Sequence, residues 1–247
     1  MRIPFDSFTL RAVVAELQPI VGAKVQRIVQ LDEHTVVIEM YGLGVDSALL
    51  ISCHPQFARA HLTTRRFASK GEPPGFWQAL RAKLTGCVLA AAEQRGFDRI
   101  LDLEFEGRGE RLRIVAELMG KHSNVMLLDS QQRVFAAMRW ISANQSARPI
   151  KANSPYVPPP FEPRPSLFFA KPGDNLKEFE GASPFLLKLI EKNGLEVLHH
   201  AEEPVLVPES GAYPVPADSL GLVGKKVKTI SQGLDQFYFA EVPRFEA

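Results

Sequence analysis

An acidic and a basic residue, Asp98 and Arg99, stand side by side in the stretch AEQRGFDRILDLEF, where a glycine turn gives way to a strand-like run. Because side chains alternate faces along a strand, the two groups are predicted to point apart, with Arg99 on the apolar face. A guanidinium is costly to bury alone, so it must lie at the rim of the sheet or meet a partner there. The pair can offer a donor and an acceptor to a ligand, or form a rim ion pair worth about 0–1 kcal/mol.

The acids that follow in the same strand have structural partners instead. The next hairpin is predicted to place Arg111 and Arg113 across from Glu104 and Glu106, as opposite charges on paired strands. Those carboxylates are thereby accounted for, whereas Asp98 is not.

A second polar cluster is the turn GKHSN, which supplies Lys121, His122, Ser123 and Asn124 around a glycine. Such a loop could grip a phosphate or a base edge, but glycine and asparagine are also what a tight turn needs for positive φ. No acid is positioned to orient His122, so His122 and Ser123 do not form a nucleophilic pair. We expect no catalytic residue, no metal site and no cofactor.

The net charge of +1 hides two parts of opposite sign. Residues 1–161 carry 20 Lys and Arg against 15 Asp and Glu, whereas residues 162–247 carry 9 against 13. The acid-free tract of residues 54–70 offers these candidate contacts: Arg59, His61, Arg65 and Arg66. A second basic tract covers residues 130–161. Such tracts suit a polyanion through phosphate neutralisation, although a solvated surface explains many of them.

The surrounding segments predict an α+β fold. A helix capped by Asp6 or Ser7 and ending before Pro19 is expected, because apolar residues recur there at helical spacing. A second helix is expected after Gly75, where the apolar residues extend from Phe76 to Leu84. Short alternating or β-branched runs between turn residues predict strands. They lie at residues 24–31, 35–42, 48–54, 58–65, 88–94, 99–106, 111–119, 124–129 and 133–140. Together they predict an antiparallel meandering sheet with packed helices.

The prolines of SPYVPPPFEPRP predict the exit from this domain near residue 161. A helix in GASPFLLKLIEKNG, with Ser183 as its cap, and a second one in LEVLHHAEE predict a short helical hairpin module. The expected division is a domain over 1–161, a Pro-rich linker over 162–176, an abbreviated helix-hairpin-helix-like segment over 177–204 and a turn-rich segment over 205–247.

The cellular compartment and the redox state of the cysteines are predicted from the lack of signal-peptide, membrane-span and metal-site patterns in the sequence. The N-terminus has no apolar run of signal-peptide length, and no segment approaches the ~20 apolar residues of a membrane span. Cys53 and Cys87 lie among apolar residues without metal-site spacing, so we expect them to be reduced packing residues. These features predict a cytoplasmic protein without a membrane partner.

Five motifs in order resemble the NFACT N-terminal domain, also called the fibronectin-binding protein A N-terminal domain. They are LLISCHPQFARAHLT, PPGFWQALRAKL, GFDRILDLEF, ELMGKHSNVMLLD and SPYVPPP, and they span about residues 3–161. GASPFLLKLIEKNGL also resembles the start of the family's helix-hairpin-helix module. The domain is similar in architecture to the N-terminal domain of formamidopyrimidine-type DNA glycosylases, whose N-terminal proline nucleophile is missing here because Arg2 and Ile3 precede Pro4. We therefore expect no enzyme.

The family is that of the RqcH-type ribosome-quality-control factors. The resemblance implies binding of tRNA and of the large ribosomal subunit carrying peptidyl-tRNA, alongside further quality-control factors, in the rescue of stalled ribosomes and the C-terminal alanine tailing of nascent chains. It also implies that the tRNA-handling pair is Asp98 and Arg99, used together with the acid of the first helix, Asp6.

Two features leave alternatives open. Family members continue into coiled-coil arms and a second NFACT domain, whereas this sequence stops at Ala247, so we expect either a fragment or a reduced relative. The domain's other name suggests a different function, that of a fibronectin-binding surface adhesin.

Overall fold

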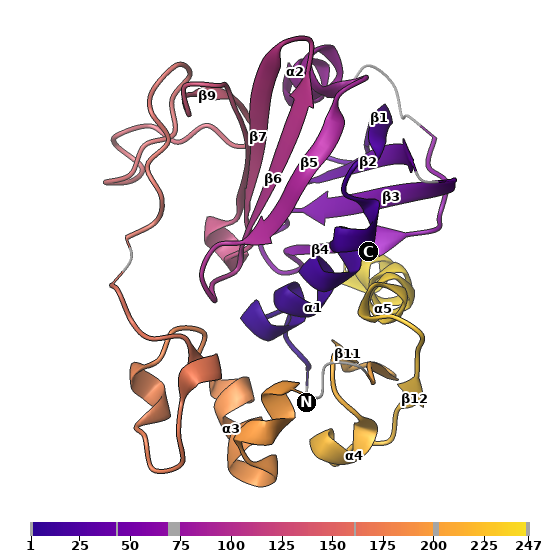
Figure 1. Ribbon diagram of the computed structural model, residues 1–247, viewed down its shortest axis with the longest axis vertical. Helices are drawn as coiled ribbons and strands as arrows, with labels where there is room; N and C mark the ends of the chain where they lie inside the picture. Colours follow the sequence, from indigo (N-terminus) through magenta and orange to yellow (C-terminus); the bar gives the residue numbers. More distant parts are fainter. Residues whose placement is uncertain (1, 43, 69–74, 161, 200–202, 246–247) are drawn as a thin grey trace. The chain divides into compact units, whose positions relative to one another are not determined.

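The computed structural model describes residues 2–42, 44–68, 75–160, 162–199 and 203–245 (Figure 1). Contacts group the chain into two compact units. The sheet unit comprises residues 17–93 and 100–161, and the composite unit comprises residues 1–16, 94–99 and 162–247. Three separate stretches of sequence thus fold into one unit. The four-part division expected from the sequence stays a prediction.

The sheet unit follows the predicted meander, which confirms the α+β class. Across the described residues its nine strands stand in the spatial order β4-β3-β2-β1-β5-β6-β7-β8-β9. Their bounds are β1 (Lys24–Gln30), β2 (Thr35–Gly42), β3 (Val45–Ser52), β4 (Arg59–Thr63), β5 (Val88–Gln94), β6 (Ile100–Gly107), β7 (Glu110–Glu117), β8 (Asn124–Leu128) and β9 (Val134–Ala137). Two short 3-10 turns accompany them, η1 (Gln18–Ile20) and η2 (Gly120–His122).

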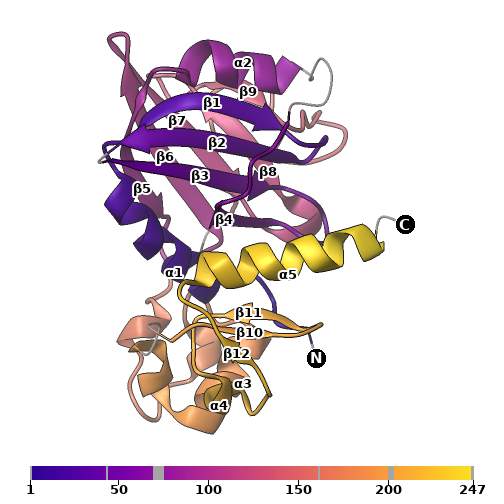
Figure 2. The same cartoon turned by 90° about the vertical axis from the view of Figure 1, so that its right-hand side faces the viewer.

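Helix α2 (Gly75–Leu84) covers part of this sheet. It buries Phe76, Leu80 and Leu84, which share one face at helical spacing. The helix contacts both β1 and β9, although four strands separate these two in the sheet order. The sheet therefore bends so that both strands reach the helix (Figure 2). Trp77 Nε1 donates to the Ile28 carbonyl oxygen over 2.7 Å and fixes the helix to β1.

The hairpin of β6 and β7 forms the predicted charge pairs. Its register sets Glu104 beside Arg113 and Glu106 beside Arg111, and both pairs are in salt-bridge contact. However, β6 begins at Ile100, so Asp98 and Arg99 are not part of the strand.

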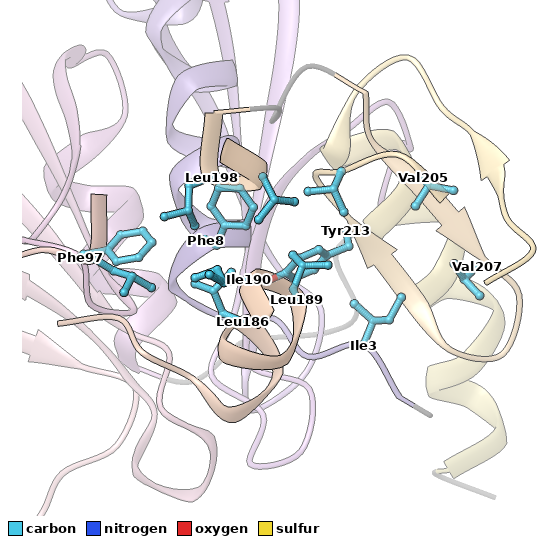
Figure 3. Packing of buried hydrophobic residues seen from close by; sticks show 13 residues of the cluster. Ile3, Phe8, Phe97, Leu186, Leu189, Ile190, Leu198, Val205, Val207 and Tyr213 are labelled. Atoms are coloured by element: carbon cyan, nitrogen blue, oxygen red, sulfur yellow. The ribbon is translucent and has the colours of Figure 1, made fainter. Parts of the chain in front are cut away.

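The composite unit combines helices with a small sheet. Its elements are α1 (Ser7–Leu17, whose last residue belongs to the sheet unit), η3 (Leu167–Phe169), η4 (Leu176–Glu178), α3 (Pro184–Asn193), η5 (Leu195–His199), β10 (Val205–Val207), β11 (Gly211–Tyr213), α4 (Ala217–Leu220), β12 (Lys225–Lys226) and α5 (Ile230–Phe245). Its core draws on every stretch of the unit: Phe8 comes from α1, Phe97 from the turn after β5, Leu186 from α3 and Tyr213 from β11 (Figure 3).

Helix α3 begins and ends as the sequence predicts. The Ser183 hydroxyl accepts the Leu186 N–H over 3.0 Å, Pro184 occupies the first turn, and Gly194 follows the last helical residue. Of the second helix expected over 195–203, residues 195–199 form the 3-10 segment η5, and residues 200–202 lie outside the described ranges. None of the helices in the described ranges has the length and apolar character that crossing a bilayer requires.

Candidate nucleic-acid interface

Asp98 and Arg99 lie in the turn before β6, and both side chains are half-buried. The Asp98 N–H donates to the Arg95 carbonyl oxygen over 3.2 Å, and the Asp98 carboxylate accepts the Arg99 N–H over 2.6 Å. These bonds occupy backbone groups that a strand would use, so the strand begins only at Ile100 and the alternation predicted for Asp98 and Arg99 does not include them. Instead of lying on the apolar face of a strand, the Arg99 guanidinium has no hydrogen bond or ion pair to the described part of the chain.

Gln94, the last residue of β5, holds this turn to helix α1. Its Nε2 donates to the Asp98 carbonyl oxygen over 2.7 Å and to the Ser7 carbonyl oxygen over 2.8 Å. One amide thus connects the candidate pair to the residue beside Asp6. Sequence reasoning missed Gln94, because a glutamine at the end of a strand carries no local signal for a contact with residue 7.

Two glycines interlock the turn with the segment around residue 180. A Cβ on Gly96 would overlap the Glu180 carboxylate, and a Cβ on Gly181 would overlap the Phe97 ring. Both glycines have positive φ, at +58° and +84° respectively. The Glu180 carboxylate also accepts the Phe97 N–H, and burial together with the nearby Asp98 carboxylate raises the pKa of Glu180. The backbone at Gly96 therefore packs against the Glu180 side chain, and the backbone at Gly181 packs against the Phe97 side chain.

Aromatic rings pack against Phe97, which belongs to the same turn as Asp98. The ring centroid of Phe168 lies 4.7 Å from that of Phe97 and 6.2 Å from that of Phe8. The guanidinium carbon of Arg11, on α1, lies 4.0 Å above the same Phe168 ring. The His199 ring meets Phe168 edge-on at 6.0 Å between centroids. The turn with Asp98 is thus held by packing of Phe97 against these rings.

Asp6 lies inside the composite unit, not at its surface. Its carboxylate accepts from the Thr9 N–H (3.0 Å) and hydroxyl (3.2 Å), from the Ser183 hydroxyl (3.2 Å) and from the Tyr213 hydroxyl (2.7 Å). Burial raises the pKa of the Asp6 carboxyl, although the hydrogen bonds oppose the shift. The same burial and the neighbouring carboxylate raise the pKa of Tyr213 well above 10. Asp6 therefore caps α1 and positions α3 and β11, and its contact with tRNA stays a prediction.

The basic tract of residues 54–70 divides into a buried and an exposed part. Arg59 is buried and donates from Nη1 to the Phe57 carbonyl oxygen over 2.9 Å. His61 is fully buried, and desolvation with the Arg59 charge lowers its pKa to about 3. Burial excludes these two side chains from a surface contact, contrary to the expectation from the tract. Arg65 and Arg66 are exposed, and the end of the tract lies outside the described residues.

The GKHSN turn is likewise split. Lys121 and His122 are exposed on η2, whereas Ser123 and Asn124 are buried. Asn124 Oδ1 accepts the N–H groups of Val125 and Arg139 over 2.9 Å each, and Nδ2 donates to the Arg139 carbonyl oxygen over 2.8 Å. The expected surface role does not fit the last two residues of the turn, because their polar groups face the protein.

The second basic tract is largely used inside the sheet unit. The guanidinium of Arg148 binds both oxygens of the buried Glu117 carboxylate, and the Tyr156 hydroxyl donates to the same carboxylate over 2.8 Å. Arg139 donates to two backbone carbonyls of the GKHSN turn, and Arg133 donates to the Asn153 carbonyl oxygen. Much of this tract therefore stabilises the loop after β9. No group of three His, Cys, Asp or Glu suited to a metal occurs within the described ranges.

Comparisons with known proteins agree with this architecture. The family described as NFACT N-terminal and middle domains matches residues 6–188. The Rqc2 homolog RqcH of Bacillus subtilis is 26% identical over 97% of this chain. A ribosome quality control complex subunit, the NEMF homolog of Drosophila melanogaster, is 31% identical over 56% of the chain. The chain spans 50% of the length of the first relative and 14% of the second.

A solved structure also has the same fold. The N-terminal part of the fibronectin/fibrinogen-binding protein from Streptococcus suis superposes with a TM-score of 0.83 at 25% identity, covering 96% of this chain and 100% of that one. The matched residues 6–188 include the turn with Asp98 and Arg99 and the segment around Glu180 that locks it. On this sequence and structural similarity, the chain belongs to the family of NFACT N-terminal and middle domains.

Proposed function

We propose that this chain is an RNA-binding module of a ribosome quality control factor, and that it binds tRNA and the large ribosomal subunit. In this role it contributes to the rescue of stalled ribosomes and to C-terminal alanine tailing in the cytoplasm, by binding and not by catalysis. The relatives named RqcH and NEMF homolog support the process, and the family match supports the kind of domain.

The observation that carries the proposal is the turn with Asp98 and Arg99. It holds a half-exposed guanidinium that no described residue neutralises, next to a carboxylate, on a base locked by Gly96 and Gly181. A cation suits an RNA phosphate or base edge, and a carboxylate accepts from an exocyclic amine or a 2′-hydroxyl. Because the turn is held rigidly, little conformational entropy is lost on binding.

The proposal is tested with the whole chain and purified components. Binding to tRNA is measured by fluorescence anisotropy at several salt concentrations, and co-sedimentation is measured with free large ribosomal subunits. We expect saturable tRNA binding that weakens as salt rises, since each neutralised phosphate releases counterions. Failure to bind either tRNA or large subunits at low salt would overturn the proposal.

A second candidate function follows from the Streptococcus suis structure, whose protein is named for binding fibronectin and fibrinogen. Under this alternative, the chain binds those extracellular proteins through an exposed face. Surface plasmon resonance with immobilised fibronectin distinguishes the two functions. Specific micromolar or tighter binding, together with no binding to tRNA, would favour the adhesin.

A further inference from the structure

An open pocket of about 550 Å³ lies beside the Gly96 turn, and its lining belongs to the composite unit alone. Its volume falls within the range of small-molecule sites. Its lining includes Arg11, Phe168, Phe169, Glu180 and His199. The pocket therefore combines cationic, aromatic and acidic groups.

The aromatic side of the pocket presents flat surfaces. The Arg11 guanidinium lies 4.0 Å from the centroid of the Phe168 ring, and Arg11 is exposed. A planar guanidinium stacks on flat rings. Phe169 is 77% exposed, although Leu167 in the same 3-10 turn is fully buried. An exposed aromatic ring offers a flat surface on which a nucleobase can stack.

The acidic side of the pocket is fixed in place. Glu180 is held by the Phe97 N–H and by its close approach to Gly96, and its backbone pairs with Ser166 in a parallel bridge. Glu180 is half-buried, and this burial together with the adjacent Asp98 carboxylate raises the pKa of its carboxyl. A carboxylate fixed in this way repels a bare anion but accepts hydrogen bonds from an amino group.

We infer that this pocket binds one unpaired nucleobase of RNA, stacked against Arg11 and Phe169, with an amino group of the base directed at Glu180. The neighbouring Arg99 then meets the ribose-phosphate backbone of the same strand. This inference rests on the proposed function and specifies which part of the RNA is recognised. Among the pyrimidines it favours cytosine, because cytosine carries an amino donor where uracil carries a carbonyl oxygen.

The test uses the whole chain and fluorescein-labelled RNA hexanucleotides of cytidine and of uridine, measured by anisotropy. These probes share ring size and charge and differ at the exocyclic group. We expect oligocytidine to bind at least fivefold more tightly than oligouridine. Glu180→Gln should bring the two affinities to within about twofold, since the amide can donate to the uracil carbonyl as well as accept.

Stacking is tested separately by Phe169→Ala, with Phe135→Ala as the matched control. Phe135 is also exposed, at 41%, but lies on β9 in the sheet unit. Phe169→Ala should weaken oligocytidine binding by roughly 5- to 150-fold, the range that loss of one stacked base gives. Because Phe169 is exposed, the variant should fold normally, which circular dichroism checks.

The outcomes separate this inference from the proposed function. Equal affinity for the two hexanucleotides, or unchanged binding after Phe169→Ala, would overturn the nucleobase pocket, while tRNA binding by the unsubstituted chain would still support the RNA-binding function. Failure of the unsubstituted chain to bind tRNA and both hexanucleotides would overturn both. Loss of the cytidine preference in Glu180→Gln, with tRNA binding retained, would support the pocket.

Discussion

The Asp6 carboxylate lies where hydrogen-bond donors from Thr9, Ser183 and Tyr213 converge. These donors belong to α1, to the start of α3 and to β11, so a single side chain connects three elements of the composite unit. Its position accounts for an acid at the start of the first helix without any contact to RNA. Asp6 thus positions the elements around it, and its contact with tRNA stays a prediction.

Replacing Asp6 separates its hydrogen bonds from its charge. Asp6→Ala should lower the free energy of unfolding by about 2–4 kcal/mol, because buried donors lose their acceptor and α1 loses its cap. Asp6→Asn should cost less, since its carbonyl oxygen still accepts the Thr9 N–H and the two hydroxyls can turn to accept from the amide. Urea unfolding at pH 7 measures both variants. Losses of equal size in the two variants would contradict this account.

The raised pKa of Asp6 predicts the sign of a pH effect. Burial raises this pKa above the ordinary value of 3.8, so the folded state holds the proton more strongly than the unfolded state does. The stabilisation from protonated Asp6 is fully present below pH 3.8 and is lost as pH rises through the folded-state pKa. Relative to Asp6→Asn, the unsubstituted chain should therefore become less stable as pH rises through that window. Urea midpoints at a series of pH values test this, and the opposite slope would refute it.

Sequence reasoning singled out some residues of the candidate site and missed others, for a physical reason. Asp98 and Arg99 stand out locally, because a charged pair at the start of an apolar strand requires a partner. Gln94 and Glu180 gave no such signal, since their contacts join segments that lie far apart in the sequence. Burial of Asn124 was equally hidden, because an asparagine in a turn fits both a surface and a structural role.

At the scale of elements, the two interlocked turns fix the pair in place. Gly181→Ala would force a methyl group into the Phe97 ring in addition to straining a φ of +84°. Gly173 is the matched control, because its φ is +97° and nothing lies within 4 Å of an added Cβ. Gly173→Ala should cost about 1–2 kcal/mol of stability from the backbone alone. Gly181→Ala should cost a further ~1–3 kcal/mol.

Urea unfolding of the two alanine variants measures that difference directly. The same comparison also bears on the site, because displacement of Phe97 would move the neighbouring Asp98 and Arg99. Equal losses for the two variants would mean that the Phe97 ring yields without cost, and the turns would then not be interlocked.

The loop after β9 is held to β7 by the buried Glu117 and its partner Arg148. Arg148→Ala should lower the free energy of unfolding by about 3–5 kcal/mol, because it leaves a carboxylate uncompensated inside the protein. Arg111→Ala, which breaks the exposed pair with Glu106, should cost less than about 1 kcal/mol. Adding Glu117→Gln to Arg148→Ala should recover part of the loss. Chemical denaturation of these variants decides the matter, and a loss in Arg148→Ala no larger than in Arg111→Ala would count against it.

Elements were predictable where the signal is local. Alternation predicted the β6–β7 hairpin and its charge pairs, and Ser183, Pro184 and Gly194 predicted the bounds of α3. The 3-10 form of residues 195–199 was not predictable, because a short apolar run does not distinguish a 3-10 segment from an α-helix. The start of β6 at Ile100, after Asp98, depends on hydrogen bonds from Gln94 and to Arg95, which the pattern of side chains does not show.

At the scale of the whole molecule, grouping of the chain is the feature least visible in the sequence. Residues 1–16 and 94–99 pack with residues 162–247 through a shared hydrophobic core. Composition and the proline and glycine residues that mark segment ends are read along the chain, and they therefore cannot reveal a unit made of separate stretches. Total charge is similarly uninformative, because Arg59 and Arg148 contribute to basic tracts but are used within the fold. Under the proposed function, the cations that remain exposed are the candidates for contact with RNA.

One measurement tests the central claim most directly, namely that the Asp98–Arg99 turn is the RNA contact. The affinity of the whole chain for tRNA is compared among the unsubstituted protein, Asp98→Ala/Arg99→Ala and the control Glu106→Ala/Arg111→Ala. Each double variant removes one acid and one base, so net charge is unchanged, and circular dichroism confirms folding. We predict that the turn variant binds at least about tenfold more weakly, within the 1–3 kcal/mol typical of such contacts, while the control changes less than about twofold. Equal affinity of all three proteins would contradict the account.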